Sequence, residues 1–179
     1  MINVGGSSGI GLATANFLHS KGADVIILDI AAPSEELPGI LFHRCDVSKW
    51  EDLRESFYDV AGDDIDYVFA NAGILENKLY FAEEFDEQGR LMEPDYSIID
   101  INVKGVYNVV KLAWSSIKRR REREEKSGKE KTPGSIVITT STAGYAPEAG
   151  FPLYSSGKTA VCSYVPIPIS LSLSLFFPS

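Results

Sequence analysis

Short apolar runs alternate along the chain with longer segments whose apolar residues recur at helical spacing. An apolar run of about four to eight residues bounded by turn residues is typical of a buried strand, and apolar positions three and four residues apart are typical of an amphipathic helix. By this pattern we expect strands at 1–4, 24–29, 40–45, 66–70 and 135–140, and helices over 12–18, 50–60 and 94–114. Strands that alternate with helices predict an α/β fold with a doubly wound parallel sheet.

The composition is ordinary for one folded domain and narrows the class of protein. The chain has 179 residues, 44% hydrophobic and 23% charged, with a formal net charge of −8. That charge argues against bulk attraction to nucleic acid or to an anionic membrane surface. No apolar run reaches the roughly 18 residues of a membrane helix, and no secretory signal pattern opens the sequence. We therefore expect a cytoplasmic protein with no membrane partner.

The cysteines and histidines do not suggest a metal site. Cys45 and Cys162 lie far apart in the sequence, and so do His19 and His43. None has the spacing of a metal-binding motif, so no metal is expected, and the histidines are interpreted as surface or packing residues. Two isolated cysteines favour a reducing, intracellular setting, with a single disulfide left open as the alternative.

The segment from Lys118 to Lys131 is a run of charge with eight basic and four acidic residues. Basic runs can bind nucleic acid, but this one mixes both signs at helical spacing in an acidic chain. We interpret it as a solvated helix end followed by a linker. Residues 74–93 are acidic and irregular, and we expect a surface loop without a chemical role there.

A glycine-rich turn follows the first strand, with the sequence Val4-Gly5-Gly6-Ser7-Ser8-Gly9-Ile10-Gly11. It leads directly into the first helical pattern. The first-turn N–H groups of a helix have no intrahelical partner, and the helix dipole favours an anion there. Glycine lets the backbone approach a pyrophosphate closely and adopt positive φ. The turn therefore indicates a phosphate site, and the alternative is a purely structural turn.

Two further segments end strands where a nucleotide would lie. Asp29 closes the second strand, 18 positions after Gly11. A carboxylate there can accept hydrogen bonds from both ribose hydroxyls and would repel a 2′-phosphate, which favours NAD over NADP. The alternative is a solvated acid at a strand end. Asn71-Ala72-Gly73 follows the fourth strand, and ligands of open α/β sheets bind at such carboxyl ends.

Tyr154 and Lys158 are four residues apart and share one face of a helix. An ammonium group beside a tyrosine favours the phenolate and lowers the tyrosine pKa. Such a tyrosine can take a proton from an alcohol or return one to a carbonyl oxygen. Ser141, at the end of the fifth strand, could hold the substrate oxygen. Asn102 lies in mid-helix near Gly105, where asparagine is unfavourable. This position indicates a functional role, and the alternative is an asparagine that merely faces solvent.

Taken together, these motifs resemble the short-chain dehydrogenase/reductase family with a Ser-Tyr-Lys catalytic set, over residues 2 to about 161. The resemblance implies a Rossmann-like sheet and NAD(P)-dependent interconversion of a secondary alcohol and a ketone. It implies catalytic roles for Asn102, Ser141, Tyr154 and Lys158, with Asn102 supporting a proton relay and Lys158 binding the nicotinamide ribose. It also implies a cofactor site made by Gly5, Ser7, Ser8, Gly9, Ile10, Gly11, Asp29, Asp46, Val47, Asn71, Ala72, Gly73, Tyr154 and Lys158.

The chain departs from the family pattern at both ends of this region. Val4 stands where family members carry a threonine whose hydroxyl braces the turn, and the first strand is short. We expect a nucleotide-binding domain over 1–161 and a divergent low-complexity tail over 162–179, in which 169–175 alternates like an edge strand. On this interpretation the sheet lacks its last strands. A catalytically inactive remnant is therefore the alternative function, and the family's homo-oligomer is doubtful here.

Overall fold

The computed structural model describes residues 1–62 and 64–163 and the backbone of 172–176. Its strands form one parallel sheet in the order β3-β2-β1-β4-β5-β6. The chain order reverses between β1 and β4, which confirms the doubly wound α/β fold. The strands are β1 (Ile2–Val4), β2 (Val25–Asp29), β3 (Ile40–Arg44), β4 (Tyr67–Ala70), β5 (Ser135–Thr139) and β6 (Ser172–Phe176).

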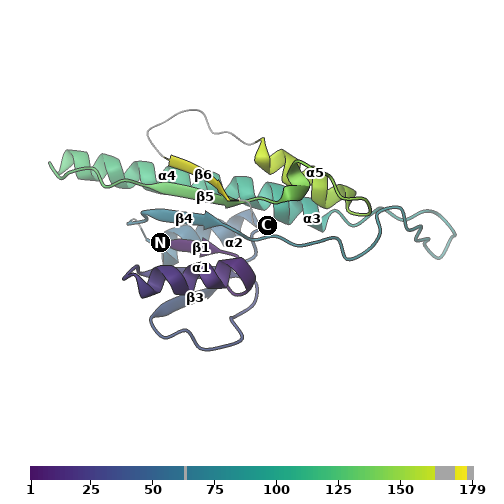
Figure 1. Ribbon diagram of the computed structural model, residues 1–179, viewed down its shortest axis with the longest axis horizontal. Helices are drawn as coiled ribbons and strands as arrows, with labels where there is room; N and C mark the ends of the chain where they lie inside the picture. Colours follow the sequence, from purple (N-terminus) through teal and green to yellow (C-terminus); the bar gives the residue numbers. More distant parts are fainter. Residues whose placement is uncertain (63, 164–171, 177–179) are drawn as a thin grey trace.

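Helices cover both faces of this sheet. Successive residues of a strand point to opposite faces, so a strand with apolar residues at successive positions needs a helix on each side. In β2, Ile27 packs with Ala15 of α1, whereas Leu28 belongs to the larger core with Leu53 of α2 and Val109 of α4. Thus α1 packs on one face of the sheet and α4 on the other (Figure 1). The helical elements are α1 (Gly9–Ser20), α2 (Trp50–Glu55), η1 (Ser56–Val60), α3 (Ser97–Ile99), η2 (Asp100–Gly105), α4 (Val106–Lys126), η3 (Thr142–Gly144) and α5 (Pro152–Cys162).

The first strand is short but central. All three residues of β1 are buried, and β1 pairs with β2 on one side and β4 on the other. The N-terminal ammonium group donates a hydrogen bond of 2.6 Å to the Asp24 carbonyl oxygen. This places the glycine turn that follows β1 in the middle of the sheet.

The helix expected over 94–114 begins at Ser97 and continues to Lys126. Its second turn, η2, is a π-helical turn that contains Asn102. The charge run is thus a helix end up to Lys126 followed by a linker, as the sequence predicted. An i,i+4 ion pair of 3.7 Å between Lys118 and Glu122 supports this part of the helix. None of the described helices is long and apolar enough to cross a membrane.

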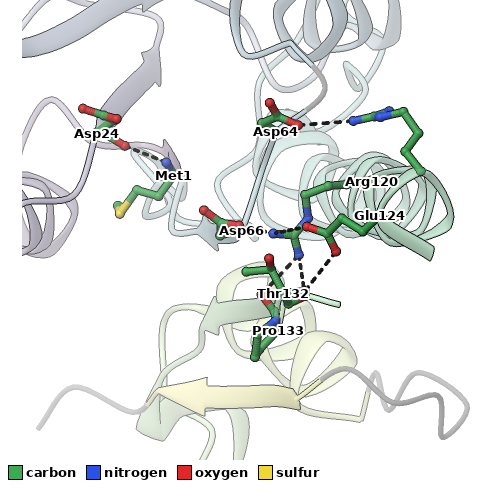
Figure 2. A network of polar contacts seen from close by, with 9 residues as sticks. Met1, Asp24, Asp64, Asp66, Arg120, Glu124, Thr132 and Pro133 are labelled. Carbon is green, nitrogen blue, oxygen red and sulfur yellow. Dashed lines mark hydrogen bonds and ion pairs between the residues drawn. The ribbon is translucent and has the colours of Figure 1, made fainter. Parts of the chain in front are cut away.

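Arg120 explains why the helix extends so far (Figure 2). Its side chain is buried and forms an ion pair with Asp66 at the start of β4. It also donates hydrogen bonds to the carbonyl oxygens of Thr132, at 2.9 Å, and Pro133, at 3.2 Å, just before β5. One residue of the charge run therefore ties α4 to two strands.

The sheet gains a sixth strand from the C-terminal segment. β6 pairs in parallel with β5, from Ser135 opposite Ser172 to Thr139 opposite Phe176. The predicted edge strand is confirmed within this range, and residues 169–171 lie outside the described part. The alternating segment thus pairs with the otherwise exposed edge of β5 and is the last strand in the described part of the chain.

Candidate functional site

A cleft of about 470 Å³ opens at the carboxyl ends of the central strands. It lies where the strand order reverses, which is the usual ligand position in open α/β sheets. Twelve of the predicted site residues line it: Gly5, Ser8, Gly9, Ile10, Asp29, Asp46, Val47, Asn71, Ala72, Gly73, Tyr154 and Lys158. Four of the predicted site residues do not line it, namely Ser7, Gly11, Asn102 and Ser141. Leu28, Ile30, Cys45, Ile74, Leu75, Ile101, Thr139 and Thr140 complete the lining.

The glycine turn is built by close backbone approach. Gly5 has φ +80°, and a Cβ atom there would lie 2.5 Å from the Cα atom of Ala72. A Cβ atom at Gly11 would overlap the carbonyl oxygen of Gly5. Larger residues at these two positions would therefore push the turn away from the strand ends. Gly11 acts through this packing rather than by lining the cleft.

Two asparagine side chains brace the turn. Asn3 Nδ2 donates to the carbonyl oxygen of Gly11 at 2.6 Å, and Asn71 Nδ2 donates to that of Gly5 at 2.9 Å. Thr139 Oγ1 in turn donates to Asn71 Oδ1 at 2.7 Å. Val4 lacks the threonine hydroxyl that braces this turn in the family, and the side-chain amides of Asn3 and Asn71 hold the turn instead. The sequence motifs did not identify Asn3 as a site residue. A polar residue within a short apolar strand is nevertheless a signal that its side chain has a buried hydrogen-bond partner.

Asp29 faces the cleft from the end of β2 and is fixed from behind. The backbone N–H of Ser7 donates to Asp29 Oδ2 at 3.0 Å. The Ser7 side chain is buried, so its contribution to the site is through this backbone group. Asp46 is held in the same manner, since its Oδ1 accepts from the N–H of Ser48 at 2.9 Å and from its hydroxyl at 2.7 Å.

Asn102 lies against the segment that follows the Asn-Ala-Gly turn. Its Oδ1 accepts from the N–H of Ile74 and its Nδ2 donates to the carbonyl oxygen of Ile74, each at 2.8 Å. The π-helical turn aims this buried side chain, and such turns are frequent at functional sites. Gly73 lies close beside it. A Cβ atom at this position would lie 3.3 Å from Asn102 Oδ1 and 3.6 Å from Lys158 Nζ, so a glycine lets the backbone approach both side chains.

Tyr154 and Lys158 lie together on α5, as the spacing predicted. The Lys158 ammonium nitrogen is 5.7 Å from the centre of the Tyr154 ring. Lys158 is buried, and its Nζ donates to the carbonyl oxygen of Thr139 at 3.0 Å. Burial lowers the pKa of Lys158 below its ordinary value, and the nearby Cys162 opposes this.

Ser141 is the N-cap residue of η3, the short helical turn that follows β5. Its Oγ accepts a hydrogen bond of 3.2 Å from the N–H of Ala143. The serine is therefore held by the turn after β5, and its hydroxyl hydrogen is left to donate elsewhere.

The sequence did not indicate Glu76, whose carboxylate contacts the first turn of α5.

The sequence pattern of the short chain dehydrogenase family matches residues 1–166 of this chain. The chain belongs to the short-chain dehydrogenase family. It is 45% identical over 163 residues to "Short-chain dehydrogenase/reductase ATR7" of Stachybotrys chlorohalonatus, covering 90% of this chain and 47% of that protein. It is 40% identical over 163 residues to the short-chain dehydrogenase/reductase prx4 of Penicillium roqueforti, covering 90% and 46%. The chain thus spans about half the length of these relatives.

Solved structures of dehydrogenases superpose on this one. The ligand-free aldohexose dehydrogenase of Thermoplasma acidophilum has a TM-score of 0.67 at 25% identity, over 89% of this chain and 56% of that one. The alcohol dehydrogenase of Thermococcus sibiricus, complexed with 5-hydroxy-NADP, has a TM-score of 0.64 at 25% identity, over 89% and 65%. Both likenesses support a Rossmann-like α/β fold for this chain.

Proposed function

We propose that this chain binds a nicotinamide dinucleotide in the cleft and belongs to an oxidoreductase that interconverts a secondary alcohol and a ketone. The observation that carries this proposal is the convergence of Tyr154 and Lys158 with the glycine turn and Asp29 on one cleft. These residues come from three separate segments of the chain, since Tyr154 and Lys158 share α5. A merely structural glycine turn would not require a tyrosine and a buried lysine beside it.

The residues present fit a dinucleotide. The pyrophosphate would lie at the N-terminus of α1, where Gly5 and Gly9 have positive φ and leave the backbone open. Asp29 would hold the adenosine ribose, and Asp46 and Val47 would flank the adenine. Asn71, Ala72 and Gly73 would support the middle of the cofactor. Residues 1–161 would form this binding domain, and the tail over 162–179 adds the edge strand β6 to its sheet.

The proposed chemistry assigns proton handling to the chain's own side chains. The nicotinamide supplies or accepts the hydride when bound. The Tyr154 phenolate takes the alcohol proton during oxidation, and the Tyr154 hydroxyl gives a proton to the carbonyl oxygen during reduction. Ser141 orients the substrate oxygen through its free hydroxyl hydrogen. Lys158 binds the nicotinamide ribose, and because its pKa is lowered, its ammonium group gives up a proton more readily to the relay that Asn102 supports.

NAD is the proposed cofactor rather than NADP. The carboxylate of Asp29 lies at the end of β2 with one oxygen bound to the Ser7 N–H. A 2′-phosphate at the same position would meet a like charge, which is unfavourable at close range. The small-molecule substrate is held next to Tyr154.

The test measures turnover of the full chain with NAD⁺ and a panel of secondary alcohols. The absorbance of the NADH formed gives the rate. Tyr154→Phe removes only the hydroxyl and should lower kcat by roughly 10²- to 10⁴-fold, the usual contribution of general acid–base catalysis. NADH affinity should change little. Equal turnover by the variant would contradict the assigned role, and cofactor binding without turnover by the unmodified chain would favour the inactive alternative.

A further inference from the structure

We propose that Glu76 is a positioning residue that holds the first turn of α5, and with it Tyr154, at the edge of the cofactor cleft. This inference rests on the proposed function, because it assigns to Glu76 the placement of the tyrosine that handles the proton. Glu76 lies in the irregular segment after the Asn-Ala-Gly turn, far from α5 in the sequence.

The contact is a double one. Glu76 Oε1 accepts from the N–H of Leu153 at 3.3 Å, and Oε2 accepts from the N–H of Tyr154 at 3.1 Å. Pro152 is the first residue of α5 and has no N–H, and Phe151 provides no side-chain cap. One half-buried carboxylate thus binds the first two N–H groups of the helix. Its charge also matches the positive end of the helix dipole.

The other end of this connection is fixed to the cofactor side of the site. Ile74, two residues before Glu76, has both its N–H and its carbonyl oxygen bound by Asn102. Ile74 and Leu75 line the cleft together with Tyr154. The short link from Ile74 to Glu76 therefore ties the tyrosine to the wall of the cleft. In Figure 1 the rest of this connection extends past the end of α5.

Lys158 does not depend on the same contact. It lies one turn further along α5 and is fixed by its own hydrogen bond to Thr139. The helix packs closely there, since a Cβ atom at Gly157 would lie 3.2 Å from Val103 Cγ2. Loss of Glu76 should therefore displace Tyr154 while the lysine and the cofactor site stay in place. This predicts an effect on kcat rather than on cofactor affinity.

The experiment compares Glu76→Ala and Glu76→Gln with the matched control Glu83→Ala, which removes an exposed acid from the same segment. Alcohol oxidation is measured at saturating NAD⁺. Glu76→Ala should lower kcat by roughly 10- to 100-fold, the scale of a misplacement near 1 Å, with NADH Kd changed less than about twofold. Glu76→Gln keeps one acceptor oxygen and should recover most of kcat, and Glu83→Ala should behave as the unmodified chain.

A second readout does not need turnover. In protein labelled with 3-fluorotyrosine, the ¹⁹F resonance of Tyr154 is the one lost in Tyr154→Phe. Glu76→Ala should shift or broaden that resonance, and Glu83→Ala should not. Unchanged kcat and an unchanged resonance in Glu76→Ala would overturn the inference. If the unmodified chain shows no turnover, the proposed function fails, and the resonance still decides whether Glu76 positions the tyrosine.

Discussion

The Lys158 ammonium group donates a 3.0 Å hydrogen bond to the backbone carbonyl oxygen of Thr139. Thr139 is the last residue of β5, so this bond fixes the middle of α5 to the carboxyl end of the sheet. The same threonine donates its hydroxyl to Asn71. A single residue thus links the proposed catalytic helix to the amide that braces the glycine turn.

Lys158→Met should remove a pH dependence of stability. Burial lowers the pKa of Lys158 in the folded state, so between that pKa and the unfolded value near 10.5 the unfolded chain binds more protons. The free energy of unfolding of the unmodified chain should therefore rise with pH through this alkaline window, relative to the variant. Urea unfolding between about pH 7 and pH 10 measures the difference. Lys111→Met, which removes an exposed lysine from α4, is the control, and a flat or falling difference for Lys158→Met would contradict the assignment.

Asn71→Ala and Thr139→Val should weaken NADH binding in a coupled manner. Each removes part of the chain of hydrogen bonds from Thr139 through Asn71 to Gly5. Asn71→Ala should raise the NADH Kd by about tenfold, which corresponds to roughly 1.4 kcal/mol. The double variant should lose about 0.5–1 kcal/mol less than the sum of the single losses. Strict additivity, measured by fluorescence titration with exposed Thr142→Val as control, would show that the three groups act independently.

Asp29→Asn should shift cofactor preference towards NADPH. The change removes the charge that opposes a 2′-phosphate and keeps an oxygen for the Ser7 N–H. The ratio of the NADPH Kd to the NADH Kd should fall by about tenfold or more, or roughly 1.4 kcal/mol. Asp24→Asn changes the same charge at the opposite end of β2 and should leave the ratio unaltered. An unchanged ratio in Asp29→Asn would place the ribose elsewhere.

Arg120→Met should be the most destabilising change in the charge run. It leaves Asp66 and the carbonyl oxygens of Thr132 and Pro133 without their buried partner (Figure 2). We expect a loss of roughly 2–4 kcal/mol in the free energy of unfolding. Arg123→Ala, whose side chain is 43% exposed and lies 3.4 Å from Asp64, should cost less than about 1 kcal/mol. Similar losses for both variants in urea unfolding would contradict this account.

The sequence predicts the parts of the structure that depend on neighbouring residues. The alternation of apolar runs gives the strands and their parallel order, and the spacing of Tyr154 and Lys158 gives their shared face. The turn from Gly5 to Gly11 is recognisable because only glycine fits its close backbone contacts. These features depend on local backbone geometry, so the spacing of residue types within a short segment predicts them.

The features that the sequence did not indicate come from distant pairs. Glu76 meets Tyr154 across 78 residues, and Arg120 meets Asp66 across 54. Nothing in the composition of either segment identifies its partner. The amide of Asn3 reaches Gly11 only once β1 and α1 are in place. The π-helical turn at Asn102 also follows from tertiary contacts, since helical spacing alone predicts a regular helix.

The most direct test of the account is a thermal unfolding titration of the full chain with NADH. If the cleft between the glycine turn and α5 binds the cofactor, NADH at about 100 times its Kd adds roughly 2.7 kcal/mol of stability. For a chain of this size, that corresponds to a rise in Tm of roughly 5–10 °C. NADPH should produce a smaller rise, and Asp29→Asn should reduce the gap between the two. A cooperative transition that neither nucleotide moves would contradict the central claim that this cleft is a dinucleotide site.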